Sequence, residues 1–188
     1  LRDGLGFAGL TLEARVSGGL LFRCLNCLLG FRHPTLGEAE YIALYDNKQT
    51  SQWTSNSIRT DWTLILERIH STRKRGLRVL DIGCNTGELL ALVPDYFKKY
   101  GVEVNKAAAE VAAARGITVY HHIEAIPAAA QFDTIILSDV IEHVTDPASF
   151  LTYLSGLLST EGEILITTGD FENHLWRKFG ASWWYCSF

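Results

Sequence analysis

The chain has 188 residues, of which 47% are apolar and 20% charged, and its formal net charge at pH 7 is −4. This length suffices for one domain with a complete hydrophobic core and a small appendage. The 17 Lys and Arg residues are spread among 21 Asp and Glu residues without forming a basic stripe, so no nucleic-acid partner is expected. No apolar run reaches the roughly 20 residues that span a bilayer, so no membrane partner is expected either.

Cellular location is predicted from the N-terminus and the cysteines. Residues 1–10 lack the basic start and apolar stretch of a signal peptide. Of the four cysteines, Cys24 and Cys27 alone have a suggestive spacing, which disfavours a disulfide-stapled secreted scaffold. We therefore expect a cytoplasmic protein.

The first part of the chain shows little periodicity. Residues 1–50 read as irregular, apart from one short helix over residues 38–45. Cys24 and Cys27 have the spacing of a zinc knuckle, but a structural zinc ion needs four ligands and one pair supplies two. Two free thiols are the alternative interpretation. Ser57–His70 then reads as an amphipathic helix, with apolar residues at steps of three or four.

From Leu77 onwards the pattern alternates between apolar runs and helical stretches. We predict strands over residues 77–82, 100–104, 117–121, 132–137 and 163–168, and helices over residues 87–98, 106–115 and 146–158. Such alternation is typical of an α/β fold with a Rossmann-like, doubly wound and mostly parallel sheet. Because the strands are apolar throughout, helices are expected on both faces of the sheet.

The turn after the first of these strands is the first candidate binding site. In doubly wound sheets, ligands bind beyond the carboxyl ends of the strands. Gly83 and Gly87 permit sharp turning and close approach of a ligand, and Asn85 tolerates a positive φ. A G-x-G-x-x-G dinucleotide fingerprint fails here, since Asn85 and Glu88 occupy its second and third glycine positions. No Walker sequence is present, so phosphate-containing nucleotides are disfavoured.

Two carboxylates indicate a different ligand. Asp81 precedes the glycine turn and can attract an ammonium group. Glu103 follows the second strand, where an acidic residue can accept both hydroxyls of a ribose. A ligand with a ribose, an ammonium group and no phosphate fits both, and S-adenosylmethionine is such a ligand.

At this point the sequence resembles the class I S-adenosylmethionine-dependent methyltransferases. The resemblance rests on VLDIGCNTGELL (79–90), YGVEVN (100–105), FDTIILSDVIEHVTDPASFL (132–151) and GEILITT (162–168), in the family's order and spacing. It covers about residues 77–168 and is strongest for small-molecule methyltransferases with an "EHV.DP" segment. The middle glycine of the family's loop is replaced by Asn85.

The resemblance assigns roles to individual positions. It implies that the turn Asp81 to Gly87 borders the methionine part of the cofactor, that Glu103 holds the ribose, and that Ser138 and Asp139 face the methyl-donating end. Val104 would lie against the adenine, and Ile123 in the stretch His122-Ile123-Glu124 would lie near its amino group. The cofactor-binding residues so expected are Asp81, Gly83, Cys84, Asn85, Gly87, Glu103, Val104, Ile123, Ser138 and Asp139.

A hydroxyl nucleophile needs a proton acceptor with a pKa near the working pH. His143 is the leading residue for this role, and Glu142 could orient it or contact substrate. The alternative is that His143 caps or packs the following helix.

The resemblance also implies a division of the chain. Residues 1–50 would contain half a zinc ribbon, with Cys24 and Cys27 as metal ligands, since several members carry such a ribbon ahead of the catalytic domain. Residues 51–76 would be a helical lead-in. Residues 77–188 would form the S-adenosylmethionine-binding domain, truncated at its C-terminus because the family has two further strands.

The expected function is methyl transfer from S-adenosylmethionine, with S-adenosylhomocysteine as product, to oxygen or carbon of a small molecule such as a sugar, a quinone precursor or a secondary metabolite. Two alternatives remain open: a non-catalytic module that binds the same cofactor, and a nicotinamide-dependent oxidoreductase, which the failed fingerprint disfavours. The sequence leaves the oligomeric state undefined.

Overall fold

A computed structural model describes residues 10–16, 19–34, 59–72, 76–170 and 174–179. The chain divides into two compact units, one of residues 38–168 and the other of residues 1–37 together with 169–188. The helix expected over residues 38–45 lies outside the described residues.

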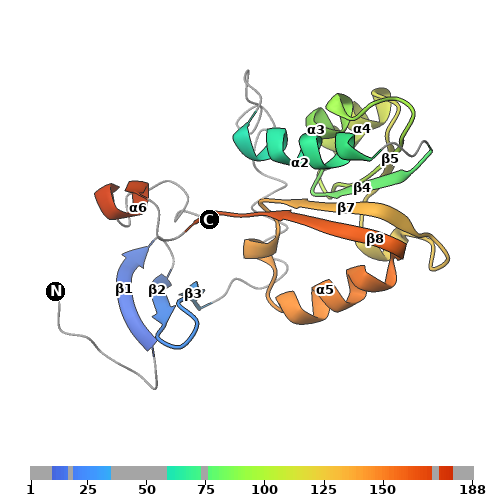
Figure 1. The fold of residues 1–188 in the computed structure, drawn as a ribbon. Helices are drawn as coiled ribbons and strands as arrows, with labels where there is room; N and C mark the ends of the chain where they lie inside the picture. Colours follow the sequence, from blue (N-terminus) through green and yellow to red (C-terminus); the bar gives the residue numbers. More distant parts are fainter. Residues whose placement is uncertain (1–9, 17–18, 35–58, 73–75, 171–173, 180–188) are drawn as a thin grey trace. The chain divides into compact units, whose positions relative to one another are not determined.

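The larger unit contains a five-stranded parallel sheet (Figure 1). Its strand order is β6-β5-β4-β7-β8. This order reverses direction between β4 and β7, as in a doubly wound fold, so the α/β prediction is confirmed. The strands are β4 (Arg78–Ile82), β5 (Lys98–Val102), β6 (Thr118–Tyr120), β7 (Phe132–Ser138) and β8 (Leu158–Thr167).

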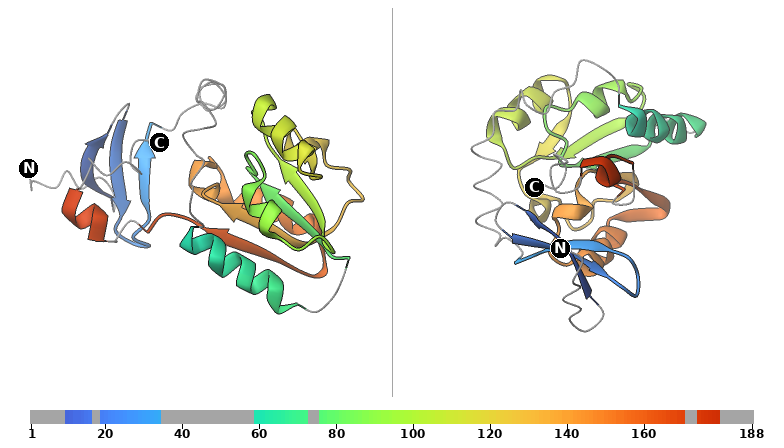
Figure 2. Two further views of the ribbon diagram at one scale, coloured as in Figure 1. Left: turned by 90° about the horizontal axis from the view of Figure 1, so that it is seen from above. Right: turned by 90° about the vertical axis from the view of Figure 1, so that its left-hand side faces the viewer.

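Helices cover both faces of this sheet, with α2, α3 and α4 on one side and α5 on the other (Figures 1 and 2). The helices are α2 (Thr60–Ser71), α3 (Glu88–Leu92), α4 (Lys106–Ala114) and α5 (Pro147–Gly156), with 3-10 turns η2 (Ile123–Ala125) and η3 (Ile141–His143). In the described part of the chain, no helix combines the length and apolar character needed to cross a bilayer.

The core has two layers because successive strand residues point to opposite faces. Val79 and Ile136 join the cluster beneath α2 and α3, whereas Leu80 and Ile135 join the cluster that includes Leu154 of α5. All five side chains are completely buried. Burial on both faces is why the strands read as continuous apolar runs.

Two element boundaries differ from the sequence prediction. The helix after the glycine turn ends at Leu92, not at residue 98, because Val93 is extended and precedes Pro94. A residue before proline disfavours the helical conformation. Strand β5 consequently starts at Lys98 and ends at Val102, which leaves Glu103 just beyond the strand.

The smaller unit corrects the expectation of an irregular N-terminal segment. Its described residues form an antiparallel sheet of β1 (Leu10–Val16), β2 (Gly19–Cys24) and β3 (Gly30–His33), in that order. The sequence of β1 alternates apolar and polar residues, which is the period of a strand. The glycines around it obscured that signal. The unit also contains the short helix α6 (His174–Phe179).

Candidate functional site

The parallel register brings the predicted cofactor-binding segments to one edge of the sheet. Ile82, the last residue of β4, pairs with Val102 of β5 and with Leu137 of β7. The chain segments that follow these three residues therefore start side by side at the carboxyl edge. Neighbouring strands lie about 5 Å apart, so a ligand of nucleoside size can contact all three segments.

The glycine turn after β4 is shaped by left-handed residues. Gly83, Asn85 and Gly87 have φ values of +73°, +47° and +77°. The N–H groups of Gly83 and Cys84 both donate to the carbonyl oxygen of Val102, at 2.9 and 3.0 Å, which ties the turn to β5. At position 87, a Cβ atom would lie 2.3 Å from Cδ1 of Ile117, so any side chain there would displace Ile117 and would also strain the left-handed backbone. Asn85 thus adopts the positive φ that its residue type was expected to tolerate.

Cys84 packs inward and does not present its thiol at the edge. A Cβ atom at Gly101 would lie 2.3 Å from the Cys84 sulfur, which shows how closely the thiol sits over β5. Burial raises the pKa of this thiol well above its ordinary value. Since the side chain is buried, the backbone of Cys84 is the part that a ligand in the turn can contact.

Asp81 is a buried carboxyl group, with 4% of its surface exposed. Burial, together with the nearby charge of Glu103, raises the pKa of Asp81 to about 8. Without a cationic partner the group is therefore mostly protonated at pH 7. A bound ammonium group would favour the ionised form, because an opposite charge nearby lowers the pKa of a carboxyl group.

Glu103 connects the turn to the start of α4. Its Oε2 accepts a hydrogen bond from the N–H of Asn85 at 2.9 Å, and its Oε1 accepts one from the N–H of Asn105 at 2.7 Å. Burial raises the pKa of Glu103, although these N–H groups oppose the shift. Each carboxylate oxygen has a second lone pair, so both can still accept a hydrogen bond from a hydroxyl group.

The two residues predicted near the adenine lie further along the same edge. Val104 is half-buried directly after Glu103. Ile123 is half-buried in η2 and packs against the core layer on the α5 side. Its carbonyl oxygen accepts a hydrogen bond of 3.4 Å from the hydroxyl of Tyr153.

Ser138 ends β7 and Asp139 follows it, and the structure surrounds them with residues that the sequence analysis missed. Asp61, in the first turn of α2, forms a two-point ion pair with Arg59, with N–O distances of 2.7 and 3.0 Å. Its Oδ2 also accepts hydrogen bonds from the hydroxyls of Ser138 and Thr167, both at 3.2 Å. Arg59 donates a further hydrogen bond to Asp139. An acid in a first helical turn is an ordinary helix-start signal, so nothing in the local sequence marked Asp61.

Glu142 and His143 lie in η3, between β7 and α5, and both are half-buried. The N–H of His143 donates to the carbonyl oxygen of Val140 at 2.9 Å. The cap of α5 is Asp146, whose side chain accepts a hydrogen bond from the N–H of Ser149 at 3.0 Å. His143 is therefore not the cap of that helix, and a proton-accepting role for it stays a prediction.

Cys24 and Cys27 lie in the other compact unit, at the end of β2 and in the turn that follows. The backbone N–H groups of Cys27 and Asn26 hold the pKa of the Cys24 thiol below its ordinary value. Both cysteines are free thiols. Over the described ranges, no group of three or more His, Cys, Asp or Glu side chains is placed to hold a metal ion, so this pair supplies two ligands of the four that zinc requires.

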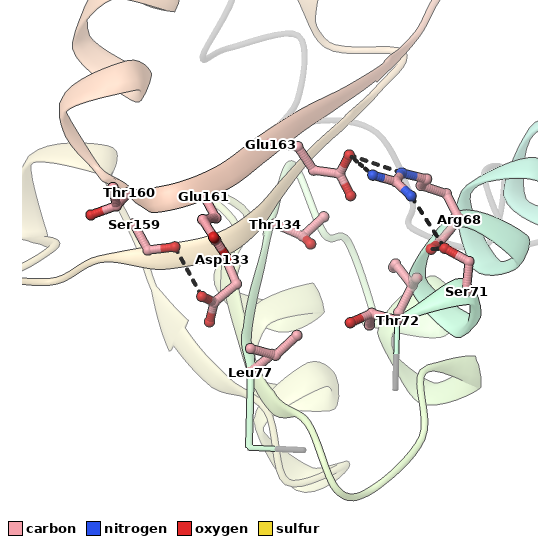
Figure 3. A pocket seen from close by; sticks show the side chains of 11 residues that line it. Arg68, Ser71, Thr72, Leu77, Asp133, Thr134, Ser159, Thr160, Glu161 and Glu163 are labelled. Atoms are coloured by element: carbon pink, nitrogen blue, oxygen red, sulfur yellow. Dashed lines mark hydrogen bonds and ion pairs between the residues drawn. The ribbon is translucent and has the colours of Figure 1, made fainter. Parts of the chain in front are cut away.

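A cavity of about 580 Å³ lies at the opposite, amino-terminal edge of the sheet, between α2 and the first residues of β7 and β8 (Figure 3). Several of its polar side chains pair with one another. Arg68 pairs with Glu163 at 2.9 Å, and Ser159 donates to Asp133 at 2.9 Å. The predicted cofactor-binding residues are not among those that line this cavity.

The parallel sheet, its strand order and its flanking helices match a class I methyltransferase fold. A family model described as "Methyltransferase domain" matches residues 56–188. The chain belongs to this family.

Individual relatives agree with that membership. The chain is 32% identical to a ubiquinone biosynthesis O-methyltransferase of Rhodopseudomonas palustris strain TIE-1, over 57% of this chain and 44% of that protein. It is also 32% identical to a protein of the same description from Aromatoleum aromaticum, over 68% of this chain and 58% of that protein. The chain thus spans about half the length of the curated relatives it matches. The fold is similar to that of magnesium protoporphyrin IX methyltransferase from Synechocystis PCC 6803, with TM-score 0.55 and 15% identity, over 68% of this chain and 74% of that one.

Proposed function

We propose that the protein transfers the methyl group of S-adenosylmethionine to an oxygen or carbon atom of a small-molecule acceptor. The observation that carries this proposal is the placement of Asp81, the turn 83–87 and Glu103 at the carboxyl ends of two adjacent parallel strands. Membership of the methyltransferase-domain family agrees with it.

The residues at this edge fit the cofactor chemically. Asp81 would hold the ammonium group, and the oxygens of Glu103 would accept the ribose hydroxyls. Within the turn, the Thr86 hydroxyl is buried without a hydrogen-bond partner among the described residues. A buried, unpaired hydroxyl is costly, and a bound polar ligand would satisfy it.

The acceptor is proposed to bind beyond the ends of β7 and β8. The relatives named for ubiquinone biosynthesis are O-methyltransferases, which favours a hydroxyl-bearing quinone precursor, although sugars and other secondary metabolites stay within the proposal. The described cysteines are free thiols, which fits a reducing compartment such as the cytoplasm.

When bound, the cofactor supplies an electrophilic methyl group on a sulfonium. The work of the protein is to align the acceptor with that group and to exclude water, and positioning alone can supply a large share of the rate. Ser138 and Asp139 are proposed to border the reacting end. His143 is proposed to take the proton from an acceptor hydroxyl, with Glu142 orienting it.

The proposal is tested by calorimetric titration with S-adenosylhomocysteine. Wild-type protein is expected to bind at micromolar concentration, and Glu103→Ala to weaken binding tenfold or more. Glu110→Ala, which changes an exposed residue of α4, is the matched control and should bind as wild type. A folded wild-type protein that does not bind this ligand would contradict the proposal. Binding without methyl transfer to any hydroxylated acceptor would favour the non-catalytic module instead.

We also propose that Cys24 and Cys27 act as zinc ligands. Support comes from their spacing and from the N–H groups that favour the Cys24 thiolate, the form that binds metal. Zinc in purified protein should be measurable by mass spectrometry and should be lost in Cys24→Ser. A metal-free protein with two titratable thiols at these positions would refute this assignment.

A further inference from the structure

Asp61 occupies an unusual position in the larger unit, where one carboxylate joins three elements. It belongs to the first turn of α2, and its Oδ2 accepts hydrogen bonds from Ser138 and Thr167. These two hydroxyl residues are partners in the parallel register and are the last residues of β7 and β8. A single carboxylate oxygen therefore holds the helix over the ends of two adjacent strands.

The same carboxylate fixes a guanidinium group. The Nε and Nη2 atoms of Arg59 contact the two oxygens of Asp61, and Nη2 also donates to Asp139. Two-point pairing of this kind restricts orientation more strongly than a single contact. Burial by itself would raise the pKa of Asp61, but Arg59 and the two hydroxyls hold it below its ordinary value, so Asp61 is ionised at neutral pH.

Asp139 is itself constrained by its surroundings. Its φ of +55° is in the left-handed region, and its N–H donates to the carbonyl oxygen of Thr167 at 3.0 Å. The residue that follows it, Val140, lies close to the turn, because a Cβ atom at Gly83 would be 3.2 Å from Cγ2 of Val140. The network thus reaches from α2 to the part of the edge that borders the turn.

We propose that Asp61 is a positioning residue for the methyl-donating end of the site: it seats the first turn of α2 on the ends of β7 and β8 and thereby holds Arg59 against Asp139. This inference rests on the proposed function. Asp61 acts through Arg59, Ser138 and Thr167, whose groups occupy its oxygens.

The chain offers a matched control at the other end of the same helix. Arg68 of α2 pairs with Glu163 of β8 at 2.9 Å, at the amino-terminal edge of the sheet (Figure 3). Glu163→Gln and Asp61→Asn therefore each remove a charge that ties α2 to the sheet. Only Asp61→Asn does so at the cofactor edge. A general loosening of α2 would appear in both variants, whereas an effect confined to the methyl-donating end is expected in Asp61→Asn alone.

The experiment is a ¹H–¹³C spectrum of S-adenosylmethionine labelled with ¹³C in its methyl group, bound to each protein. Asp61→Asn should move or broaden the bound methyl signal, whereas Glu163→Gln should leave it at the wild-type position. Because S-adenosylhomocysteine lacks the methyl group, Asp61→Asn should change its dissociation constant by less than about threefold. Thr167→Val, which removes one hydroxyl and keeps the ion pair, should move the signal by a smaller amount.

The outcomes are separable. An Asp61→Asn signal at the wild-type position, or an equal shift in Glu163→Gln, would overturn the positioning role and leave the proposed function intact. If Asp61→Asn does not fold, the test passes to Thr167→Val. A bound methyl signal at the wild-type position in folded Thr167→Val would then overturn the positioning role. Absence of any bound signal with folded wild-type protein would overturn the proposed function, and this inference with it.

Discussion

The carboxylate of Glu103 accepts a hydrogen bond from the backbone N–H of Asn85, with 2.9 Å between Oε2 and nitrogen. The residue that follows one strand thus holds the turn that follows the neighbouring strand. The other oxygen accepts from Asn105, so the same side chain braces the start of α4. Glu103 is therefore predicted to shape the turn before any ligand arrives.

Replacing Glu103 with Gln should expose that bracing role. A glutamine side chain can accept through its oxygen only, so one of the two N–H groups loses its partner. We expect faster hydrogen exchange at the amides of Asn85 and Asn105, and about tenfold weaker binding of S-adenosylhomocysteine. Glu124→Gln, at an exposed position of the same edge, is the control. Unchanged exchange at both amides would show that the turn holds its shape without this carboxylate.

Asp81→Asn is predicted to stabilise the protein at the cost of cofactor binding. The pKa of Asp81 is about 8 in the folded protein against a reference value of 3.8, so folding favours the protonated form. That contribution is complete below about pH 4 and is lost as the pH rises through about 8. The variant should therefore gain on the order of 5 kcal/mol in unfolding free energy relative to wild type between pH 4 and pH 8. Denaturant titrations at the two pH values measure this difference, and a constant difference would contradict it.

Cofactor binding should release protons at pH 7 if Asp81 receives an ammonium group. The free protein holds this carboxyl group mostly protonated, and the bound cation lowers its pKa. Affinity for S-adenosylhomocysteine should accordingly increase between pH 6.5 and about 8, the range that ends near the Asp81 pKa. Calorimetry in two buffers of different ionisation enthalpy counts the protons. A count that is the same in Asp81→Asn and in wild type would assign the release to another group.

Gly101→Ala should disturb the turn through Cys84. The new Cβ atom would lie 2.3 Å from the Cys84 sulfur and 3.0 Å from its Cβ. Overpacking of this kind costs about 1–3 kcal/mol. Gly156→Ala is the matched control, because nothing lies within 4 Å of its added Cβ atom. Thermal unfolding should show a loss of stability for Gly101→Ala and not for Gly156→Ala. Adding Cys84→Ala to Gly101→Ala should restore part of the lost stability. Equal stability of the two variants would mean that the turn moves aside freely.

The thiols should differ in reactivity towards iodoacetamide. Burial raises the pKa of Cys84, whereas N–H groups lower that of Cys24, and Cys27 is exposed. Since the thiolate is the nucleophile, Cys24 and Cys27 should be alkylated about tenfold faster than Cys84 at pH 7.5 once a chelator has removed any bound metal. Peptide mapping by mass spectrometry resolves the sites. Protection of Cys24 and Cys27 that a chelator removes would support the proposed zinc ligation.

Much of the larger unit could be predicted from the sequence because its signals are local. Apolar runs of four to seven residues separated by helical stretches indicate a parallel sheet, and a parallel sheet brings the residues after β4, β5 and β7 to one edge. Asp81, the glycine turn and Glu103 were found in this way. Pro94, which follows the end of α3, is an equally local signal. The apolar periodicity nevertheless predicted a helix that continued to residue 98.

The tertiary structure decided what depends on residues distant in the chain. The hydrogen bonds from Ser138 and Thr167 to Asp61 join residues that are 77 and 106 positions apart in the sequence. An acidic residue in the first turn of a helix is common, so the local sequence does not indicate these partners. The burial that raises the pKa of Asp81 is also a product of packing from both faces of the sheet. Local patterns determined which segments meet at the carboxyl edge. Side-chain geometry across the assembled sheet determined how that edge is braced and charged, because hydrogen bonds and desolvation depend on distances that only the folded chain defines.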